Sequence, residues 1–360
     1  MPPMDITGLR LYNQHLAQPQ FTDPADIVRR LGAVQAQDYN GAAWALGQRL
    51  KGATAESVDN SFNNGDIVRT HVLRPTWHFV APEDVRWMLD LTAKRIRMQT
   101  ATRLRFMELN DAIFDKCSNI ITRLLEGGKQ LARTDIATAL KQDGIATNEQ
   151  RFIHIMLELE LQQLICSGGH EGNQLTYALL DERMPKTKTL ARDEALAKLA
   201  QRYFTAHGPA TLHDFAWWSG LTLEECKKGL EECGKGLEKY IHGAITYWFR
   251  VETSYAGKSI PAHLLPNYDE YIVGYKDRSL TINAKDIDKA DPRGTIFNHT
   301  VLLNGKIAGL WKRELKKNNQ LLDITPFKPL SNASHAAISA AAKRYAQFLG
   351  VKGSILSIKT

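Results

Sequence analysis

Residues 24–50 have the sequence PADIVRRLGAVQAQDYNGAAWALGQRL, and this stretch decides which fold we expect. Asp23 can cap a helix, and Pro24 suits the first turn of that helix. Apolar side chains then recur at the spacing of a buried helix face, namely Ile27, Val28, Leu31 and Val34. The stretch therefore predicts a helix over 24–34 that packs one face against a core.

The apolar pattern stops at Gln35-Ala36-Gln37-Asp38 and restarts behind Gly41, where it predicts a second helix over 41–51. Two amides and a carboxylate thus fall at a break between two buried helices. Loops held by rigid elements often carry binding and catalytic residues. A glutamine beside a helix end is more commonly solvated or capping, so the residue types alone leave the role of this break open.

The composition is that of an ordinary globular protein. The 360 residues suffice for two or three domains, and 43% hydrophobic with 24% charged residues is typical of a soluble chain. The sequence has no run of roughly 18 apolar residues, which a membrane span needs. Its first residues, Met-Pro-Pro-Met-Asp, lack the basic and apolar regions of a secretion signal. We therefore expect a cytoplasmic protein without a membrane partner.

Cysteine usage predicts neither disulfides nor a metal site. The sequence has no Cys-x-x-Cys pair and no Cys/His spacing typical of zinc fingers. We therefore expect no metal, no other cofactor and four reduced thiols, which are Cys117, Cys166, Cys226 and Cys233.

Charge gives the first indication of a partner. The formal net charge is +7, which informs on partners rather than on the fold. Basic residues also gather in two places, Lys94, Arg95, Arg97, Arg103 and Arg105 in one, and Lys312, Arg313, Lys316 and Lys317 in the other. Such groups are more often solvated faces than binding surfaces. Two of them in a basic chain nevertheless favour a polyanion.

The predicted elements repeat along the chain. A helix, a turn, a helix and a strand pair form the outline of a winged helix, and we expect this outline over residues 1–106, 107–186 and 187–260. The second copy includes a Gly-rich hairpin tip at 166–173. From about 261 the pattern changes, and Asn304-Gly305 predicts a tight hairpin turn. The fold class that we expect is α+β: three tandem winged-helix units and a mixed α/β element, 261–360, packed on the third unit.

Residues 71–80 predict the strand of the first wing. Its alternation puts Arg74, Thr76 and His78 on one face. Pro75 indicates an edge strand or a distorted one. We expect Trp77, on the other face, to be a core residue rather than a surface for stacking bases.

Four stretches together resemble the AlkZ-like DNA glycosylases, bacterial proteins built of tandem winged helices. They are Leu31–Asp38, Arg69–His78, Leu265–Ser279 and the hairpin over 301–311, and the resemblance spans nearly the whole chain. A Gln-x-Gln motif is the catalytic signature of that family, and Gln35 and Gln37 match it. Where the family usually has Gly before Thr in the second stretch, this sequence has Pro75.

The resemblance implies hydrolysis of the N-glycosidic bond of purines alkylated at N7, including guanines linked across the two strands. An N7-alkylated guanine already carries positive charge, so it departs without a strong general acid, and the transition state resembles an oxocarbenium ion. A glutamine carbonyl can position the attacking water and favour the developing sugar cation. We expect Gln35 and Gln37 to share this role. A cross-linked base cannot be extruded into a tight pocket, so we expect a wide cleft.

Two further residues are candidates for supporting roles. Asp38 would be a stronger base than the glutamines, or it caps the following helix, which is the interpretation that we favour. His78, like Arg74, either reaches a phosphate or the lesion, or forms hydrogen bonds across the first wing.

We expect double-stranded DNA carrying alkylated purines as the partner of a monomer. Basic residues would contact the phosphates. The candidates are Arg74, Lys94, Arg95, Arg97, Arg103, Arg105, Lys312 and Arg313. A non-catalytic winged-helix DNA-binding protein, such as a transcription regulator, is the alternative, and a purely structural protein is a third. Regulators use a recognition helix in the major groove, but the helix predicted over 147–165 contains only one Arg or Lys, Arg151.

Overall fold

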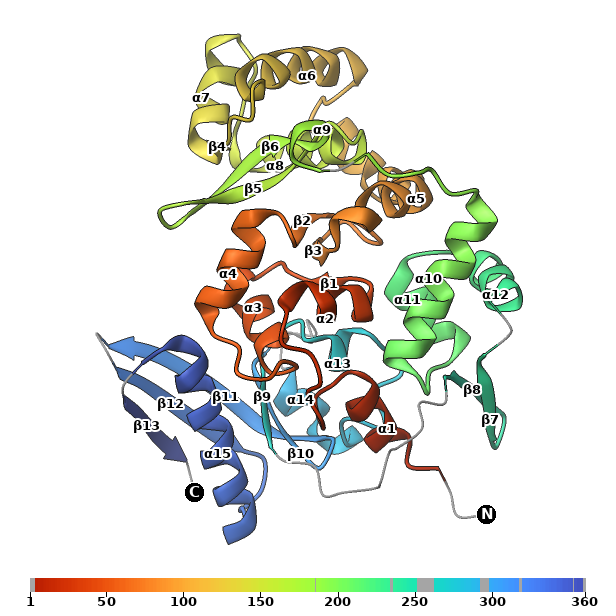
Figure 1. Cartoon of the computed structure of the whole chain (residues 1–360), viewed down its shortest axis with the longest axis vertical. Coiled ribbons are helices and arrows are strands. Elements are labelled where there is room, and N and C mark those ends of the chain that lie inside the picture. The colour runs from red at the N-terminus through yellow and green to blue at the C-terminus, as the bar shows by residue number, and fades with distance from the viewer. Residues whose placement is uncertain are drawn as a thin grey trace.

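The computed structural model describes residues 4–184, 186–233, 236–250, 262–291, 298–316, 319–351 and 353–358. Lys317, one of the basic residues named above, lies outside these ranges. Figure 1 shows three groups of helices with small sheets, and a larger sheet at the C-terminal end. No helix in the described part of the chain is long and apolar enough to cross a membrane.

The first group of elements begins with α1 (Ile6–Asn13) and ends with α5 (Val85–Phe106). Between them lie α2 (Pro24–Leu31), β1 (Val34–Gln35), α3 (Tyr39–Gly47), α4 (Ala55–Asn64), β2 (Val68–His71), β3 (Trp77–Val80) and a 3-10 helix (Pro82–Asp84). The three strands form an antiparallel sheet in the order β1-β3-β2.

Side-chain caps explain where these helices start. The carboxylate of Asp23 accepts the N–H of Ala25, with Pro24 in the first turn of α2. Thr54 and Ser57 form a reciprocal capping box at the start of α4. Each cap satisfies backbone donors that have no partner within the helix.

The prediction of one continuous strand over 71–80 is wrong. Residues 72–76 form a tight turn between β2 and β3, and Leu73 has a left-handed backbone with φ 64°. Two short strands therefore replace one long strand. Arg74 and His78 no longer share a strand face, because Arg74 belongs to the turn.

The second group repeats this order of elements: α6 (Asp111–Leu125), β4 (Leu131–Ala132), α7 (Arg133–Gln142), α8 (Glu149–Leu161), β5 (Ile165–Glu171) and β6 (Gln174–Leu179), followed by α9 (Leu180–Arg183). Its sheet order is β4-β6-β5. The hairpin tip lies at Gly172, with φ 59°, rather than over the whole of 166–173. Gly168 lies within β5, where a Cβ would come 2.2 Å from the hydroxyl of Thr176.

The third group contains α10 (Arg192–His207), α11 (Leu212–Ser219), α12 (Leu223–Glu232), β7 (Glu238–His242) and β8 (Ile245–Phe249). A single antiparallel bridge between Ala210 and Trp248 stands where the other groups have their first strand. The group packs closely on the first one, since a Cβ on Gly220 would lie 2.3 Å from the carbonyl oxygen of Leu73.

The C-terminal region has a five-stranded sheet in the order β13-β12-β11-β10-β9. Its elements are β9 (His263–Leu265), α13 (Glu270–Val273), a 3-10 helix (Ala284–Asp286), α14 (Ile287–Ala290), β10 (Thr300–Leu303), β11 (Lys306–Lys316), β12 (Asn319–Pro326), α15 (Asn332–Leu349) and β13 (Gly353–Ile358). Asn304 and Gly305 form the expected hairpin turn, with φ of 49° and 75°.

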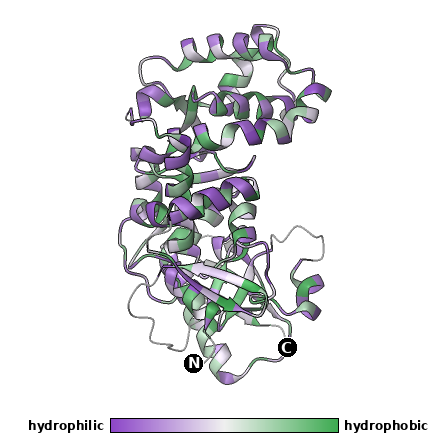
Figure 2. Ribbon diagram, turned by 90° about the vertical axis from the view of Figure 1, so that its right-hand side faces the viewer, coloured by the Kyte–Doolittle hydropathy of each residue, from purple (hydrophilic) through white to green (hydrophobic). Residues whose placement is uncertain are grey.

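We expected the C-terminal region to pack on the third group, but it packs on the first group as well. Its sheet and α15 share a core with α2, α3 and α4 of the first group, including Trp44, Trp311 and Tyr345. The segment around α13 also reaches the third group, where Tyr203 donates to the carbonyl oxygen of Gly274 at 2.9 Å. Viewed from the side in Figure 2, the second group and the C-terminal sheet lie at opposite ends of an elongated molecule.

A buried ion pair joins the first group to the C-terminal region. Arg49 on the segment after α3 donates two hydrogen bonds to the carboxylate of Asp269, at 2.8 and 2.9 Å. The two side chains are 1% and 0% exposed. The same guanidinium also donates to the side-chain oxygen of Gln14 at 3.0 Å. The segment that leads into α13 is therefore fixed against the first group.

Replacing Asp269 by alanine should destabilise the protein by about 3–5 kcal/mol, because it leaves the Arg49 charge buried without its carboxylate. Urea unfolding measures this loss. The matched control is Asp193→Ala, whose pair with Lys228 is about half exposed and should contribute less than about 1 kcal/mol. Similar losses in the two variants would show that the buried pair does not hold the two regions together.

Candidate active site

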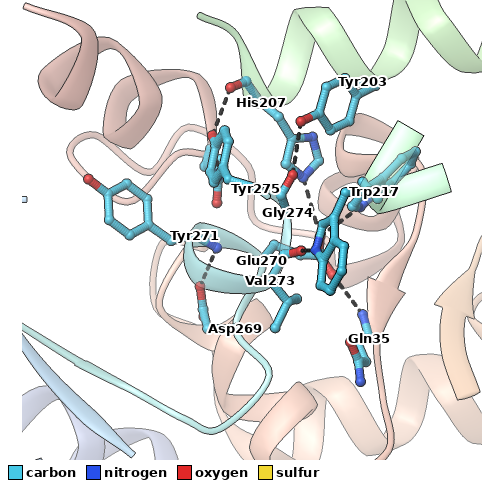
Figure 3. Close-up of polar contacts among 12 residues, drawn as sticks. Gln35, Tyr203, His207, Trp217, Asp269, Glu270, Tyr271, Val273, Gly274 and Tyr275 are labelled. Atoms are coloured by element: carbon cyan, nitrogen blue, oxygen red, sulfur yellow. Dashed lines mark hydrogen bonds and ion pairs between the residues drawn. The ribbon is translucent and has the colours of Figure 1, made fainter. Parts of the chain in front are cut away.

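Gln35 lies at the centre of the first group, on the two-residue strand β1. Gln35 pairs with His78 of β3, and its side chain is only 6% exposed. Its backbone N–H does not complete the sheet but donates to Oε1 of Glu270 at 2.8 Å. Figure 3 shows this bond reaching from β1 to α13. The position of Gln35 is therefore set by a residue far along the chain.

The side chain of Gln35 is also occupied. Arg74, in the turn between β2 and β3, donates from Nη2 to the side-chain oxygen of Gln35 at 3.2 Å. Burial lowers the pKa of Arg74, and the nearby charge of Glu270 offsets part of that effect. Arg74 thus makes a hydrogen bond within the first wing, one of the two roles predicted for it.

Glu270 is a fully buried carboxylate with several donors around it. Its Oε2 accepts the indole N–H of Trp218 at 2.9 Å and lies 3.3 Å from Nε2 of His207. Burial alone would raise the pKa of Glu270, but the hydrogen bond and charge of His207 and the N–H of Gln35 outweigh it. The net shift lowers the pKa, so the group is ionised at neutral pH. A negative charge therefore lies directly behind the Gln35 backbone (Figure 3).

Gln37, in contrast, is exposed. Ala36, the residue before it, forms hydrogen bonds through both of its backbone polar groups. The N–H of Ala36 donates to the carbonyl oxygen of Trp77 at 2.7 Å. The carbonyl oxygen of Ala36 accepts from Nε of Arg69 at 2.9 Å. Gln37 therefore projects from a fixed backbone, and the structure separates the two glutamines into a buried one and an exposed one.

Asp38 is the cap of α3. Its Oδ1 accepts the N–H of Gly41 at 3.2 Å, which is the favoured one of the two roles predicted for this carboxylate. The bond fixes the chain on the far side of Gln37. Gln37 is thus held between Ala36 and a helix cap.

His78 is completely buried beside Gln35. Its Nδ1 lies 2.8 Å from the carbonyl oxygen of Thr76, and among the described residues its Nε2 has no partner. Burial, helped by the charge of Arg74, lowers the pKa of His78 to about 3. The imidazole is therefore neutral at physiological pH and does not bind phosphate as a cation.

The five basic residues of α5 that the sequence singled out are not all available to a ligand. Arg97 pairs with Glu158 at 3.0 Å, and Arg95 donates to the carbonyl oxygen of Gly220 at 3.2 Å. The other three side chains are exposed, namely Lys94, Arg103 and Arg105.

The second basic group lies on β11. Lys312 is exposed, whereas Arg313 is half-buried and donates to the hydroxyl of Tyr345. In Figure 1, β11 and α5 lie on opposite sides of the first group. The two basic groups therefore do not form one continuous patch.

The residues that support this loop include several that were not predicted from the sequence. Two of them bond to the loop directly, namely Glu270 to Gln35 and Arg69 to Ala36. His207 and Trp218 act through Glu270. The sequence spacing of these residues gives no sign of such contacts. Glu270 and Arg69 do lie in Leu265–Ser279 and Arg69–His78, two of the stretches that carried the family resemblance. All four cysteines are free, and no cluster of metal-binding side chains occurs within the described ranges.

Comparisons with known proteins agree on the class. The family model described as "DNA glycosylase AlkZ-like" matches residues 28–348. A curated relative, "Interstrand DNA cross-link repair glycosylase" of Streptomyces sahachiroi, is 24% identical over 355 residues, covering 93% of this chain and 94% of the relative. The solved structure of Streptomyces sahachiroi DNA glycosylase AlkZ is similar with a TM-score of 0.80 at 21% identity, covering 98% of each chain.

The class of protein is thus a DNA glycosylase, a hydrolase of the N-glycosidic bond. The chain belongs to the AlkZ-like DNA glycosylase family, since the family model matches most of its length.

Replacing Glu270 by alanine should slow base release by about 100-fold, because β1 loses the acceptor that holds Gln35, and small displacements at a reacting centre cost this much. Single-turnover base release from methylated DNA measures the effect. The control is Asp214→Ala, since Asp214 is an equally buried carboxylate that pairs with Arg10 and holds the backbone at Lys276 and Asp277, but makes no hydrogen bond to β1 in the described part of the chain. A folded Glu270→Ala protein with a rate within about threefold of the wild type would contradict the role of Glu270.

Proposed function

We propose that the protein removes purines alkylated at N7 from double-stranded DNA, including guanines linked across the two strands. The observation that carries this proposal is Gln37, an exposed amide on a loop fixed at both neighbouring residues. The name of the curated relative, an interstrand cross-link repair glycosylase, supports the cross-linked substrate.

The two glutamines have different parts in the proposed reaction. Gln37 holds the attacking water, because its amide is the exposed one and a glutamine carbonyl accepts from water. Gln35 is already bonded to Arg74 and Glu270, so it supports the loop instead of holding the water itself. From the sequence alone, we expected the two glutamines to share the positioning of the water.

The chemistry requires little acid catalysis. An N7-alkylated guanine leaves as a neutral base, so the enzyme has mainly to place the water and stabilise the sugar cation. The ionised carboxylate of Glu270 is one hydrogen bond behind β1, and in a dry interior such a charge acts over a longer range than in water. It therefore favours a developing positive charge near the loop.

The rest of the chain is proposed to bind DNA as a monomer. The recurring order of helices and strands supports three winged-helix units at 1–106, 107–186 and 187–260, with 261–360 as a fourth part. Lys94, Arg103 and Arg105 are the exposed members of the α5 basic group, and Lys312 is the exposed one on β11. Contacts from such side chains to phosphates fix orientation without reading sequence.

Replacing Gln37 by alanine should lower the rate of 7-methylguanine release from methylated DNA by about 100- to 1,000-fold, the range for loss of one group that acts on the transition state. DNA binding, measured by fluorescence anisotropy, should change less than about threefold. The matched control is Gln142→Ala, an exposed glutamine on α7. A Gln37→Ala protein that still releases the base at the wild-type rate would overturn the proposed role of Gln37.

The same assay separates the enzyme from a regulator. Wild-type protein that binds DNA but releases no base from any of several alkylated duplexes would favour the non-catalytic winged-helix alternative. Release of 7-methylguanine would exclude that alternative.

Removing the exposed charges of α5 should reduce the salt dependence of DNA binding. Each of Lys94, Arg103 and Arg105 that contacts a phosphate should lower the slope of log K against log salt by about 0.9 when replaced by alanine. The control replaces three exposed lysines elsewhere, namely Lys276, Lys285 and Lys343. An equal change of slope in both triple variants would show that α5 has no special part in binding.

A further inference from the structure

A cavity of about 410 Å³ lies between the first and second groups of elements. Residues from β2, β3, α7, α8, β5 and β6 line it, including Arg69, Trp77, Glu160, Ser167, Thr176 and Tyr177. The volume lies within the range of small-molecule sites in proteins, and it exceeds that of a purine. Trp77 is half-buried at this cavity instead of lying in the core, which corrects the expectation from the sequence.

The cavity adjoins the glutamine loop. Arg69 and Trp77 are the two residues whose Nε and carbonyl oxygen hold Ala36, at 2.9 and 2.7 Å. Ala36 directly precedes Gln37. A base bound in the cavity would therefore lie next to the residue that we propose to hold the water.

Glu160, on α8, has one carboxylate oxygen without a hydrogen-bond partner among the described residues. Its Oε2 accepts from the hydroxyl of Thr70 at 3.1 Å and from the N–H of His71 at 2.9 Å, and lies 2.7 Å from Nδ1 of His71. Its Oε1 is buried and has no partner among the described residues. Buried acceptors are rarely left in this state, so an unpartnered oxygen at a cavity points to a ligand with a donor.

Arg69 supplies donors beside that acceptor. Its guanidinium lies over the ring of Trp77, 4.2 Å from the ring centre, and its Nε is the atom bonded to Ala36. The remaining N–H groups of a guanidinium form a planar fork that suits an oxygen acceptor. A carboxylate and a guanidinium thus stand together on the wall of one cavity.

We propose that this cavity recognises the guanine edge of the alkylated base, an inference that rests on the proposed function. Guanine presents O6 as an acceptor and N1–H and N2–H₂ as donors, which match Arg69 and Glu160 respectively. Adenine presents the opposite pattern, a donor at N6 and an acceptor at N1, and would face unpaired groups. Trp77 and Tyr177 supply aromatic surface to the base.

The position of the alkyl group is compatible with this arrangement. N7 lies on a different edge of the base from N1 and N2, so its substituent would point away from Glu160. Thr134 and Gln174 at the cavity are exposed, so the cavity opens to solvent. An N7 substituent, including a tether to the other strand, therefore has a way out, as a cross-linked substrate requires.

Binding of free bases tests the subsite without relying on catalysis. Saturation-transfer NMR with the full-length protein should show 7-methylguanine binding at least about tenfold more tightly than 7-methyladenine, the discrimination that a good two-point contact to a base gives. In Glu160→Gln this preference should fall below about twofold, because the acceptor that faces N1–H and N2–H₂ is partly replaced by a donor. Tyr177→Leu should weaken both bases alike.

Glu158→Gln is the matched control. Glu158 is a nearly buried carboxylate on the same helix, but it pairs with Arg97 and does not line the cavity. Its replacement should leave the base preference unchanged, and thermal unfolding establishes that each variant is folded. Absence of 7-methylguanine binding, equal binding of the two bases by wild type, or a preference that survives in Glu160→Gln would each overturn the subsite. Wild-type release of 7-methylguanine from DNA would stand regardless, so failure of the subsite and of the glycosylase function are distinguishable.

Discussion

The hydrogen bond from the Gln35 backbone to Glu270 is the contact on which the candidate active site depends. A carboxylate at the centre of the molecule loses its hydration, a cost of several kcal/mol unless donors surround it. Gln35, Trp218 and His207 supply those donors, from the first and third groups of elements. The charge can therefore be buried only when three distant parts of the chain are assembled, so formation of the site and of the fold are coupled.

This coupling explains why two neighbouring glutamines differ. A motif with one residue between two amides would place both side chains on the same face of a continuing strand. Here β1 ends at Gln35, and Asp38 starts a helix only three residues later. The chain must leave the strand within that interval. Gln35 consequently stays in the interior with Arg74, while Gln37 turns toward solvent.

Local signals in the sequence predicted the local structure well. Caps such as Asp23 and Thr54 mark helix starts, and the Asn304-Gly305 turn is formed as expected, because each depends on a few adjacent residues. The prediction of a continuous strand over 71–80 was wrong, since the turn at Leu73 packs on Gly220 of the third group.

Long-range contacts account for the rest of what the sequence did not reveal. Glu270 is 235 positions from Gln35, and no periodicity relates the two. The shared core of the C-terminal region and the first group is equally distant in sequence. The stretches that carry the family resemblance include Glu270, Arg69 and Arg74, but they do not show that these residues hold the loop, because that depends on contacts formed only in the folded chain.

The charged residues buried near the glutamine loop hold its backbone in place. Glu270 and Arg74 bond to Gln35, whereas Arg69 bonds to Ala36 and Glu160 bonds to the neighbouring strand β2. Both arrangements fix backbone next to Gln37 and leave its own side chain unconstrained. In the reaction that we propose, a neutral amide suffices there because the fixed charges around it, rather than a titrating group at the reacting atom, supply the electrostatic field. Burial holds His78 neutral, and the donors around Glu270 hold it ionised, so neither group exchanges a proton at physiological pH. Such a site suits a leaving group that is already charged and would serve poorly for an unmodified base, which needs a proton to depart.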